Sequence, residues 1–593
     1  MGAPRHRKWE VGLVLKMCSF RRIIPLVGAA LLALACAPAA TTNPGITGEA
    51  AKPAAPKTLI MAVQDEATTV LLYGRLGEGG NTSARYERYQ IFHANLTIYD
   101  QQSNVVAYAA EKVPSIENGD WKVSPDGTME VTWHIRPDAY WHDGIPLAAE
   151  DFAFGFQVVT DKKLPVTGLG ELLKISKVQA VDPHTLRVSW KEPSIYGNAN
   201  AIEGIPAIPK HALEETYLNS EAPAFAASPA WRDEYIGLGP FKVTSLVIGS
   251  QIEAQAFDKF FLGRPKIDRL VYRWYPEPNV LVAAMLAGAV DVAPSASGFK
   301  PEQLVQLRSQ WGPDGGDVYT AETDVRSMAL NWRENGAWTR DVRFRQAMLQ
   351  SMDRGQLTED LQFGFVPIAE YFAGRQDPLY KLAEQRNVPK NLYDPASASR
   401  LFAEAGWTKG ADGLLRNAGG ETVPFPCCRR AADSNNEREA VAFGSYMKTA
   451  GLDVIYPVPG APAGVSALET RKIQALGWGG LVSNFRPAIG ENWADFISAQ
   501  IPGDNNQWVG LNSIAWSNST YDDLYTKAMG TLDPGQRQSI ELQLLTIAAN
   551  EIPMLPVYYT PNGVAVRKGV LNVGRGIVLN RGIIMGIQNW DLK

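Results

Sequence analysis

Two short motifs bring together residue types that could do acid–base or phosphate chemistry. The first, Trp141-His142-Asp143-Gly144, places an imidazole beside a carboxylate. Adjacent side chains on an extended segment point to opposite faces, so His142 and Asp143 would not readily meet, and the Asp-Gly step is typical of a turn. The second, Gly237-Leu238-Gly239-Pro240, lacks the third glycine of a dinucleotide-binding loop, and its proline has no backbone N–H. We predict structural roles for both.

Common enzyme signatures are absent from the sequence. There is no G-x-x-x-x-G-K-[ST] phosphate loop, no H-E-x-x-H and no G-x-S-x-G nucleophile elbow. The histidines after residue 35 show no metal-ligand spacing; they are His93, His134, His142, His184 and His211. We therefore predict no metal, no cofactor and no enzymatic activity. A secreted hydrolase is the alternative, although no assembled nucleophile or carboxylate pair supports it.

A glycine-flanked tryptophan segment is the main candidate for ligand binding. Residues 477–486 read Gly-Trp-Gly-Gly-Leu-Val-Ser-Asn-Phe-Arg. Glycines let a ligand approach the backbone closely, and a rigid indole near amide and guanidinium groups can hold an extended polar ligand. Core packing is the alternative for the tryptophans, and a loop turn is the alternative for an asparagine pair. We predict the following ligand contacts: Trp478, Asn484, Arg486, Trp493, Asn505 and Asn506.

The elements that must position these residues are mixed strands and helices. Apolar residues alternate with polar ones over 129–135, 186–190 and 270–274, a period of two that predicts half-buried strands. Asp-Pro steps at 394–395 and 533–534 predict helix starts, and a third helix is predicted over 339–353. No short repeat recurs. These patterns predict an α/β protein.

The first residues read as an export leader. Arg21 and Arg22 precede an apolar run that ends in small residues before Cys36, and the run is too short to span a bilayer comfortably. Residues 32–36, Leu-Ala-Leu-Ala-Cys, resemble a bacterial lipobox, which predicts a lipid on Cys36. Cleavage by ordinary signal peptidase is the alternative. We expect a signal peptide over 1–35, with Met17 as an alternative start, and a flexible Ala- and Pro-rich tether over 36–57.

Composition and cysteine count narrow the possibilities further. The 593 residues are 45% hydrophobic and 20% charged, with a net charge of −5, and the leader is itself basic. An acidic body is poorly suited to nucleic-acid binding. Only Cys427 and Cys428 lie in the body, without a C-x-x-C pair or a nearby histidine cluster, so a zinc site is not expected. Free thiols are the favoured interpretation, and a vicinal disulfide is the alternative.

Several stretches together resemble the family 5 extracellular solute-binding proteins, the dipeptide/oligopeptide-binding group of bacterial ABC importers. The resemblance extends over most of residues 58–590 and keeps the family's motif order. The matching stretches are 121–127, 135–137, 141–144, 149–152, 239–243, 263–268, 341–347, 353–354, 403–407 and 551–556.

This resemblance implies a two-lobed periplasmic-binding-protein-like α/β fold, class II and of the large type, with the ligand cleft between the lobes. Lobe I would be discontinuous, 58–325 plus 558–593, with an extra subdomain over about 101–235. Lobe II would span 330–555, and the crossings would lie near 328–332 and 556–559. The implied partners are an ABC permease, the membrane through the lipid anchor and a small-molecule ligand. The protein would act outside the cytoplasm as a monomer, either anchored to the outer face of the cell membrane or in the periplasm.

One departure from the family pattern concerns the ligand. Peptide-binding members usually place an aspartate shortly after the tryptophan of the Gly-Trp segment, where it pairs with the peptide ammonium. Here no carboxylate follows Trp478 before Glu491. A buried ammonium without a counter-charge is unfavourable. A peptide or other small polar solute is the first expectation; an oligosaccharide, a nickel chelate, and a sensory or chaperone role on the same fold stay as alternatives.

Overall fold

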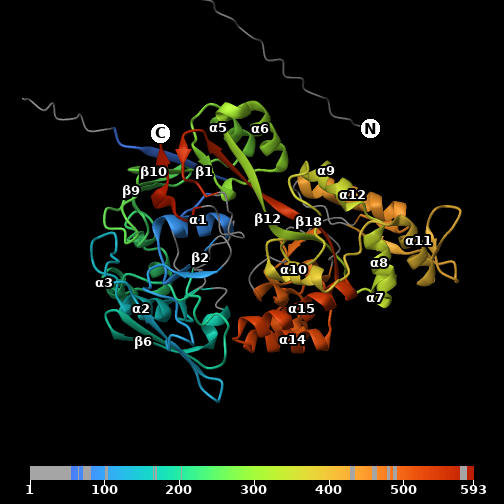
Figure 1. Cartoon of the computed structure of the whole chain (residues 1–593), viewed down its shortest axis with the longest axis horizontal. Helices are drawn as coiled ribbons and strands as arrows, with labels where there is room; N and C mark the ends of the chain where they lie inside the picture. Colours follow the sequence, from blue (N-terminus) through green and yellow to red (C-terminus); the bar gives the residue numbers. More distant parts are fainter. Residues whose placement is uncertain are drawn as a thin grey trace, which may run out of the picture. The chain divides into compact units, whose positions relative to one another are not determined.

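An eight-stranded mixed sheet forms the centre of the structure (Figure 1). Its strand order is β17-β12-β18-β11-β1-β10-β9-β8; β1 is parallel to β10 and β11, and all other neighbours are antiparallel. The strands are β1 (Thr58–Val63), β8 (Phe241–Val247), β9 (Gln251–Ala256), β10 (Arg269–Trp274), β11 (Val292–Ala293), β12 (Gly316–Ala329), β17 (Leu481–Asn484) and β18 (Met554–Arg567).

This computed structural model describes residues 55–64, 66–70, 82–100, 104–164, 166, 170–201, 204–427, 434–456, 464–476, 481–484, 490–574 and 584–593. The predictions for the signal peptide, for Cys36 and for almost all of the tether lie outside these residues. Pro56–Lys593 forms one compact unit. Within the described residues, no helix combines the length and the hydropathy needed to cross a membrane.

Two long strands connect separate hydrophobic cores. β12 and β18 pair along their length, with a register shift between Glu322 and Val325. On one side of the shift Val325 and Val557 are buried in a core with Met348 and Leu544, whereas on the other side Val564 belongs to a core built on β1 and β10. The strand pair therefore runs from one core into the other.

A four-stranded antiparallel sheet carries the third core. Its order is β4 (Trp121–Val123), β5 (Met129–His134), β7 (Thr185–Trp190) and β6 (Ile175–Asp182), with α2 (Ala149–Val159) packed on it. The alternation predicted for β5 and β7 is confirmed, since alternate side chains of both strands are buried. The turn before β5 closes with Ser124 N–H donating to Thr128 C=O at 2.8 Å.

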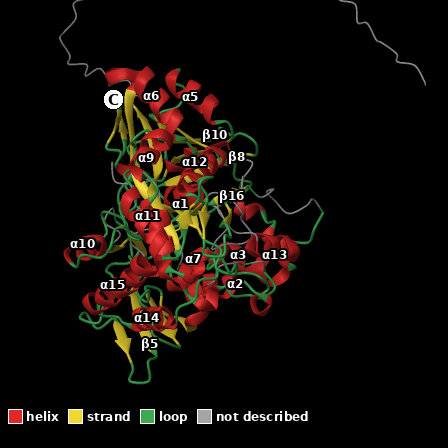
Figure 2. Cartoon of the chain, turned by 90° about the vertical axis from the view of Figure 1, so that its right-hand side faces the viewer, coloured by secondary structure: helices red, strands yellow, loops and turns green. Residues whose placement is uncertain are grey.

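Helices surround these sheets (Figures 1 and 2). They are α1 (Thr82–Phe92), α3 (Lys210–Asn219), α4 (Ala222–Ala226), α5 (Pro278–Leu286), α6 (Pro301–Gly315), α7 (Ala337–Arg340), α8 (Val342–Gln350), α9 (Arg354–Gln362), α10 (Pro378–Gln385), α11 (Pro395–Glu404), α12 (Ser434–Ala450), α13 (Ala467–Leu476), α14 (Ser519–Gly530) and α15 (Pro534–Glu551). The predicted starts of α11 and α15 are confirmed, since Asp394 and Asp533 accept from Ser397 N–H and Gln536 N–H.

The single helix predicted over 339–353 is wrong. Asp341 is extended (φ −136°, ψ 122°), and its carboxylate accepts from Arg343 N–H, so it ends α7 and caps α8. Asp353 likewise caps α9 rather than ending the preceding helix. Aspartate at these positions satisfies helix N–H groups that have no partner within the helix, which favours a new start.

Cys427 follows the short strand β15 (Pro424–Pro426), is fully buried and takes part in a disulfide. The expectation of a free thiol at Cys427 is therefore wrong. Its partner lies outside the described residues. A disulfide is consistent with an exported protein, because extracytoplasmic compartments are oxidising.

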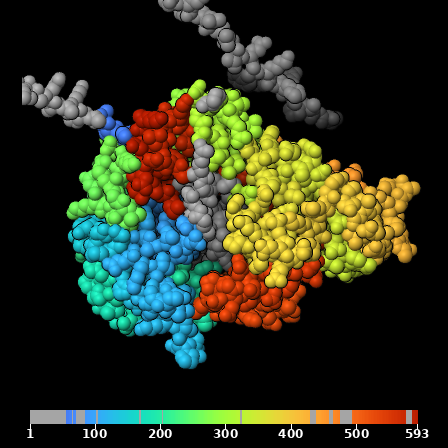
Figure 3. All heavy atoms as spheres, viewed as in Figure 1, coloured from blue at the N-terminus to red at the C-terminus, as the bar shows by residue number. Residues whose placement is uncertain are grey.

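The C-terminal residues return to the first strand (Figure 3). Lys57, just before β1, forms an ion pair with Asp591, and its backbone N–H donates to Asp268 beside β10 at 2.8 Å. Trp590 is fully buried in the same core as Leu59. Chain segments separated by more than 500 residues thus complete one core.

Candidate functional site

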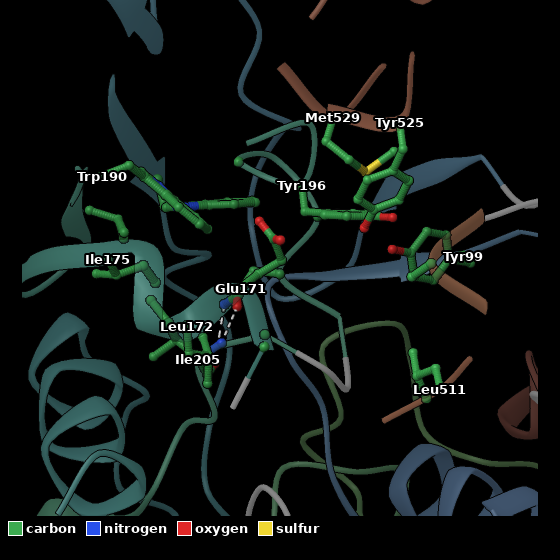
Figure 4. A pocket seen from close by; sticks show the side chains of 18 residues that line it. Tyr99, Glu171, Leu172, Ile175, Trp190, Tyr196, Ile205, Leu511, Tyr525 and Met529 are labelled. Atoms are coloured by element: carbon green, nitrogen blue, oxygen red, sulfur yellow. Dashed lines mark hydrogen bonds between the residues drawn. The ribbon is translucent and has the colours of Figure 1, made fainter. Parts of the chain in front are cut away.

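A cavity of about 310 Å³ lies between the four-stranded sheet and the region around α14 (Figure 4). This volume falls at the small end of the range of ligand pockets. Its lining is mainly aromatic and aliphatic: Tyr99, Trp133, Gly170, Glu171, Leu172, Ile175, Val188, Trp190, Tyr196, Gly197, Ala199, Asn200, Gly204, Ile205, Ala494, Leu511, Tyr525 and Met529.

One wall comes from neighbouring strands β5 and β7. The paired residues Trp133↔Leu186 and Met129↔Trp190 put both indoles on the same buried face of the sheet. Trp190 is only 6% exposed, and its Nε1–H has no hydrogen-bond partner in the described part of the chain. A buried indole N–H is a donor that normally finds an acceptor.

The opposite wall comes from α14 and the loop before it. Asn518 caps α14 by accepting from Tyr521 N–H at 3.1 Å, and this start places Tyr525 and Met529, four residues apart, on one helix face. Leu511 completes this wall but is 54% exposed. The cavity is thus bounded by two segments from different hydrophobic cores.

The polar groups of the cavity wall are mostly engaged. Glu171 accepts from Ser194 Oγ and forms an ion pair with Lys174 Nζ at 2.8 Å. The Asn200 side chain accepts from Ile205 N–H at 2.5 Å and donates to Ile205 C=O at 3.2 Å. In Figure 4 the hydroxyl ends of Tyr99, Tyr196 and Tyr525 point toward one another on one side of the cavity.

A second, smaller cavity of about 30 Å³ shares Tyr99 with the first. This is close to the volume of one water molecule. Its lining includes the hydroxyls of Tyr89 and Thr97, which have no hydrogen-bond partner among the described residues. Burial, helped by nearby His142, lowers the pKa of His93 to about 3, so this ring stays neutral. The small cavity suits an ordered water.

His142 and Asp143, neighbours in the first motif, have separate partners in the structure. His142 Nδ1 accepts from Gly237 N–H at 3.2 Å, and Nε2 donates to Gly239 C=O at 2.9 Å. Asp143 instead contacts His211 Nε2 at 2.7 Å. The His142 ring therefore binds the backbone of the second motif, and His142 and Asp143 do not form an acid–base pair with each other. No cluster of three or more His, Cys, Asp or Glu side chains within the described ranges could hold a metal.

The predicted ligand segment is only partly described. Trp478, Arg486 and the side chain of Asn484 lie outside the described residues, although the backbone of Asn484 pairs with Val325 at the edge of the large sheet. Trp493 is 5% exposed in the core that contains Phe496.

The asparagine pair lies in a short 3₁₀ turn, η6 (Asp504–Asn506). Asn505 is exposed, whereas Asn506 accepts from Gly503 N–H and donates to Ile501 C=O. This geometry caps the turn. A role in ligand binding stays a prediction for all six residues, and the structure brings together in one described place only the pair 505–506.

Sequence reasoning missed two features of the structure. The first is the cavity wall formed by Trp133 and Trp190. The alternation of apolar and polar residues predicts that these side chains are buried, but it does not distinguish a packed face from a cavity wall. The other is a buried network in which the Arg326 guanidinium and the Tyr558 hydroxyl both contact the Glu439 carboxylate. Arg326 pairs with Ser483 of β17, so this network lies beside the predicted ligand segment.

Comparison with known proteins finds a family model that matches more than half of the chain. The model of the bacterial extracellular solute-binding proteins, family 5 Middle, matches residues 113–483. Oligopeptide-binding protein AppA of Bacillus subtilis is 25% identical over 567 residues, covering 91% of this chain and 92% of that protein. Di/tripeptide-binding protein 4 of Pseudomonas aeruginosa is 24% identical over 496 residues, covering 78% and 83%.

Solved structures share the fold. The oligopeptide-binding protein of Thermus thermophilus, complexed with a pentapeptide, has a TM-score of 0.64 at 25% identity and covers 87% of this chain and 92% of that one. NikA of Brucella suis, in complex with Fe(III)-EDTA, has a TM-score of 0.72 at 19% identity and covers 90% and 100%. The two-lobed solute-binding α/β fold is therefore confirmed. The ligands of these two structures are chemically unlike, so the fold alone does not choose a ligand.

Proposed function

Because this chain belongs to family 5 of the bacterial extracellular solute-binding proteins, we propose that it is the extracytoplasmic binding component of an ABC importer. It captures a peptide-like or other small polar solute between two lobes and delivers it to a membrane permease. The observation that carries this proposal is the similarity to an oligopeptide-binding protein over 91% of the chain. Members of this family are solute-binding transport proteins and not enzymes.

We propose two lobes with the bounds predicted from the sequence, and the presence of separate hydrophobic cores supports this division. Lobe I comprises 58–325 and 558–593, with the extra subdomain at about 101–235, and lobe II comprises 330–555. The change of core along β12 and β18 supports lobe crossings on these two strands, for which we keep the predicted positions near 328–332 and 556–559. Hinge closure needs only a few residues to absorb the backbone rotation, and a ligand that contacts both lobes favours the closed state.

The proposed ligand contacts are the six residues predicted from the sequence, Trp478, Asn484, Arg486, Trp493, Asn505 and Asn506. A peptide-like solute comes first because the named relatives above are peptide-binding proteins. An oligosaccharide is the second candidate, and the absence of a carboxylate between Trp478 and Glu491 favours it. We further propose that Cys36 carries a lipid that anchors the protein, as a monomer, to the outer face of the membrane.

Thermal-shift measurements of the purified protein against peptide and oligosaccharide libraries test the proposal. A ligand at about 100 times its Kd adds roughly 2.7 kcal/mol to the stability of the folded state. A shift with peptides supports the peptide proposal. If free-amine peptides are among them, a carboxylate other than one shortly after Trp478 must pair with the peptide ammonium. A shift with oligosaccharides alone selects the second candidate. No shift with any solute, together with hydrolysis of one of them, overturns a binding role.

A further inference from the structure

We propose that the cavity of about 310 Å³ bounded by β5, β7 and α14 is a subsite for an aromatic side chain of the captured solute, with a polar atom that accepts a hydrogen bond from Trp190 Nε1. This inference rests on the proposed function, and it names a chemical group that the ligand must carry. The residues that line it include none of the six predicted ligand contacts.

The lining matches an aromatic group. The side chains of Trp133, Trp190, Tyr196 and Tyr525 offer ring faces and edges, and Ile175 and Met529 offer apolar surface. Aromatic pairs in edge-to-face or offset contact are favourable beyond the area they bury, and a methionine sulfur adds contact with a ring. At about 30 Å³ per water molecule, the cavity holds roughly ten waters, enough to be replaced by one ring and its linking atoms.

The unpartnered indole indicates that the group has a polar end. Trp190 is more than nine-tenths buried, and its Nε1–H finds no acceptor among the described residues. A buried donor without an acceptor is unfavourable, so an occupant that supplies an oxygen there is preferred over an occupant of the same shape without one. The Glu171 carboxylate, also in the cavity wall, does not take this role: it contacts Lys174 and Ser194, and no hydrogen bond joins it to Trp190.

The position of the cavity links its occupancy to lobe closure. Trp133 and Trp190 belong to the core of the four-stranded sheet, whereas Tyr525 packs against the core of α14 and α15. Leu511 at the rim is 54% exposed although it lines the cavity. A ring held between these walls contacts both sides and gives Leu511 an apolar partner, so it stabilises the closed arrangement.

Matched peptides provide the test. The probes are peptides of equal length that bind the wild-type protein and differ at one position in Ala, Phe or Tyr, scanned along the peptide. We expect one position at which Phe binds roughly ten- to a hundredfold more tightly than Ala, from the burial of an aromatic side chain. At that position Tyr should exceed Phe by about two- to tenfold, from one hydrogen bond.

Variants assign this preference to the cavity. Met529→Trp fills the space and should abolish the Phe-over-Ala preference, whereas Lys527→Ala, exposed on the same helix, should keep it. Trp190→Phe should keep the Phe-over-Ala preference and lose the preference for Tyr. If Met529→Trp does not fold, Tyr525→Ala serves instead and should weaken the aromatic preference by about tenfold.

The outcomes separate this inference from the proposed function. Peptide binding by the wild type without any aromatic preference, or with a preference that survives Met529→Trp, overturns the subsite and leaves the binding function in place. Binding of an oligosaccharide that Met529→Trp abolishes overturns the aromatic side chain as occupant. Absence of binding to every solute overturns the proposed function itself, and the subsite with it.

Discussion

Replacing the buried His142 by glutamine should make the protein less sensitive to acid. Its imidazole is fixed as the neutral form by two backbone groups, with Nδ1 accepting from Gly237 N–H and Nε2 donating to Gly239 C=O. Protonation of Nδ1 removes the acceptor that Gly237 uses. Burial, with an added contribution from the Lys242 ammonium, lowers the pKa of His142 from 6.5 to about 4.

The sign and size of the effect follow from this lowered pKa. Above pH 6.5 the ring is neutral in both folded and unfolded chains, so it adds no pH dependence. Between pH 6.5 and about 4 the unfolded chain binds a proton that the folded protein does not. The free energy of unfolding therefore falls by about 1.4 kcal/mol for each pH unit below about 6.5, or about 3 kcal/mol in all.

Urea unfolding at about pH 8, 6.5, 5.5 and 4.5, followed by tryptophan fluorescence, measures the difference. His142→Gln should be less stable than the wild type at the highest pH, because the glutamine amide meets the two backbone groups less well. That deficit should shrink steadily as the pH falls below about 6.5. His93 is present in both proteins, and burial is a larger cause of its lowered pKa than His142, so most of its contribution cancels. Two stability curves that stay parallel over the whole pH range would refute the buried neutral ring as a source of acid sensitivity.

Three further outcomes are expected. Glu439→Ala removes a buried carboxylate that contacts two side chains, and should lower the free energy of unfolding by about 3–5 kcal/mol. Glu404→Ala, at an exposed position, should change it by no more than about 0.5 kcal/mol. Equal effects of the two substitutions in urea unfolding would contradict the burial argument. Gly239→Ala places a Cβ 2.4 Å from backbone atoms and should destabilise the folded protein by about 1–3 kcal/mol. Gly530→Ala places its Cβ in open space and should be neutral or slightly stabilising. A change in melting temperature of the same size in both variants would count against the clash. Trp478→Ala should abolish ligand binding in calorimetry while the circular dichroism spectrum is retained, and unchanged affinity would remove that segment from the site.

Sequence patterns predicted many of the strands and helices, because these elements depend on residues that are close together in the chain. The alternation in β5 and the Asp-Pro starts of α11 and α15 each depend on a few consecutive residues. The break at Asp341 shows the limit, because the same aspartate fits a helix surface or a cap, and only the geometry decides between them. The cavity wall could not be predicted from the sequence. Trp190 and Tyr525 are 335 positions apart, and no periodicity reports a contact between such distant segments.

The strand order of the large sheet sets when the protein can finish folding as it is made. β18 lies between β12 and β11, and Val566 of β18 pairs with Val292, which is synthesised 274 residues earlier. The sheet therefore stays open between β11 and β12 until residues 554–567 have been added. Segments that emerge first usually fold first, yet here β11 and β12 must wait for β18, the strand that lies between them. Under the proposed extracytoplasmic function this delay is useful, because a protein whose central sheet cannot close early can still be threaded through a translocation channel.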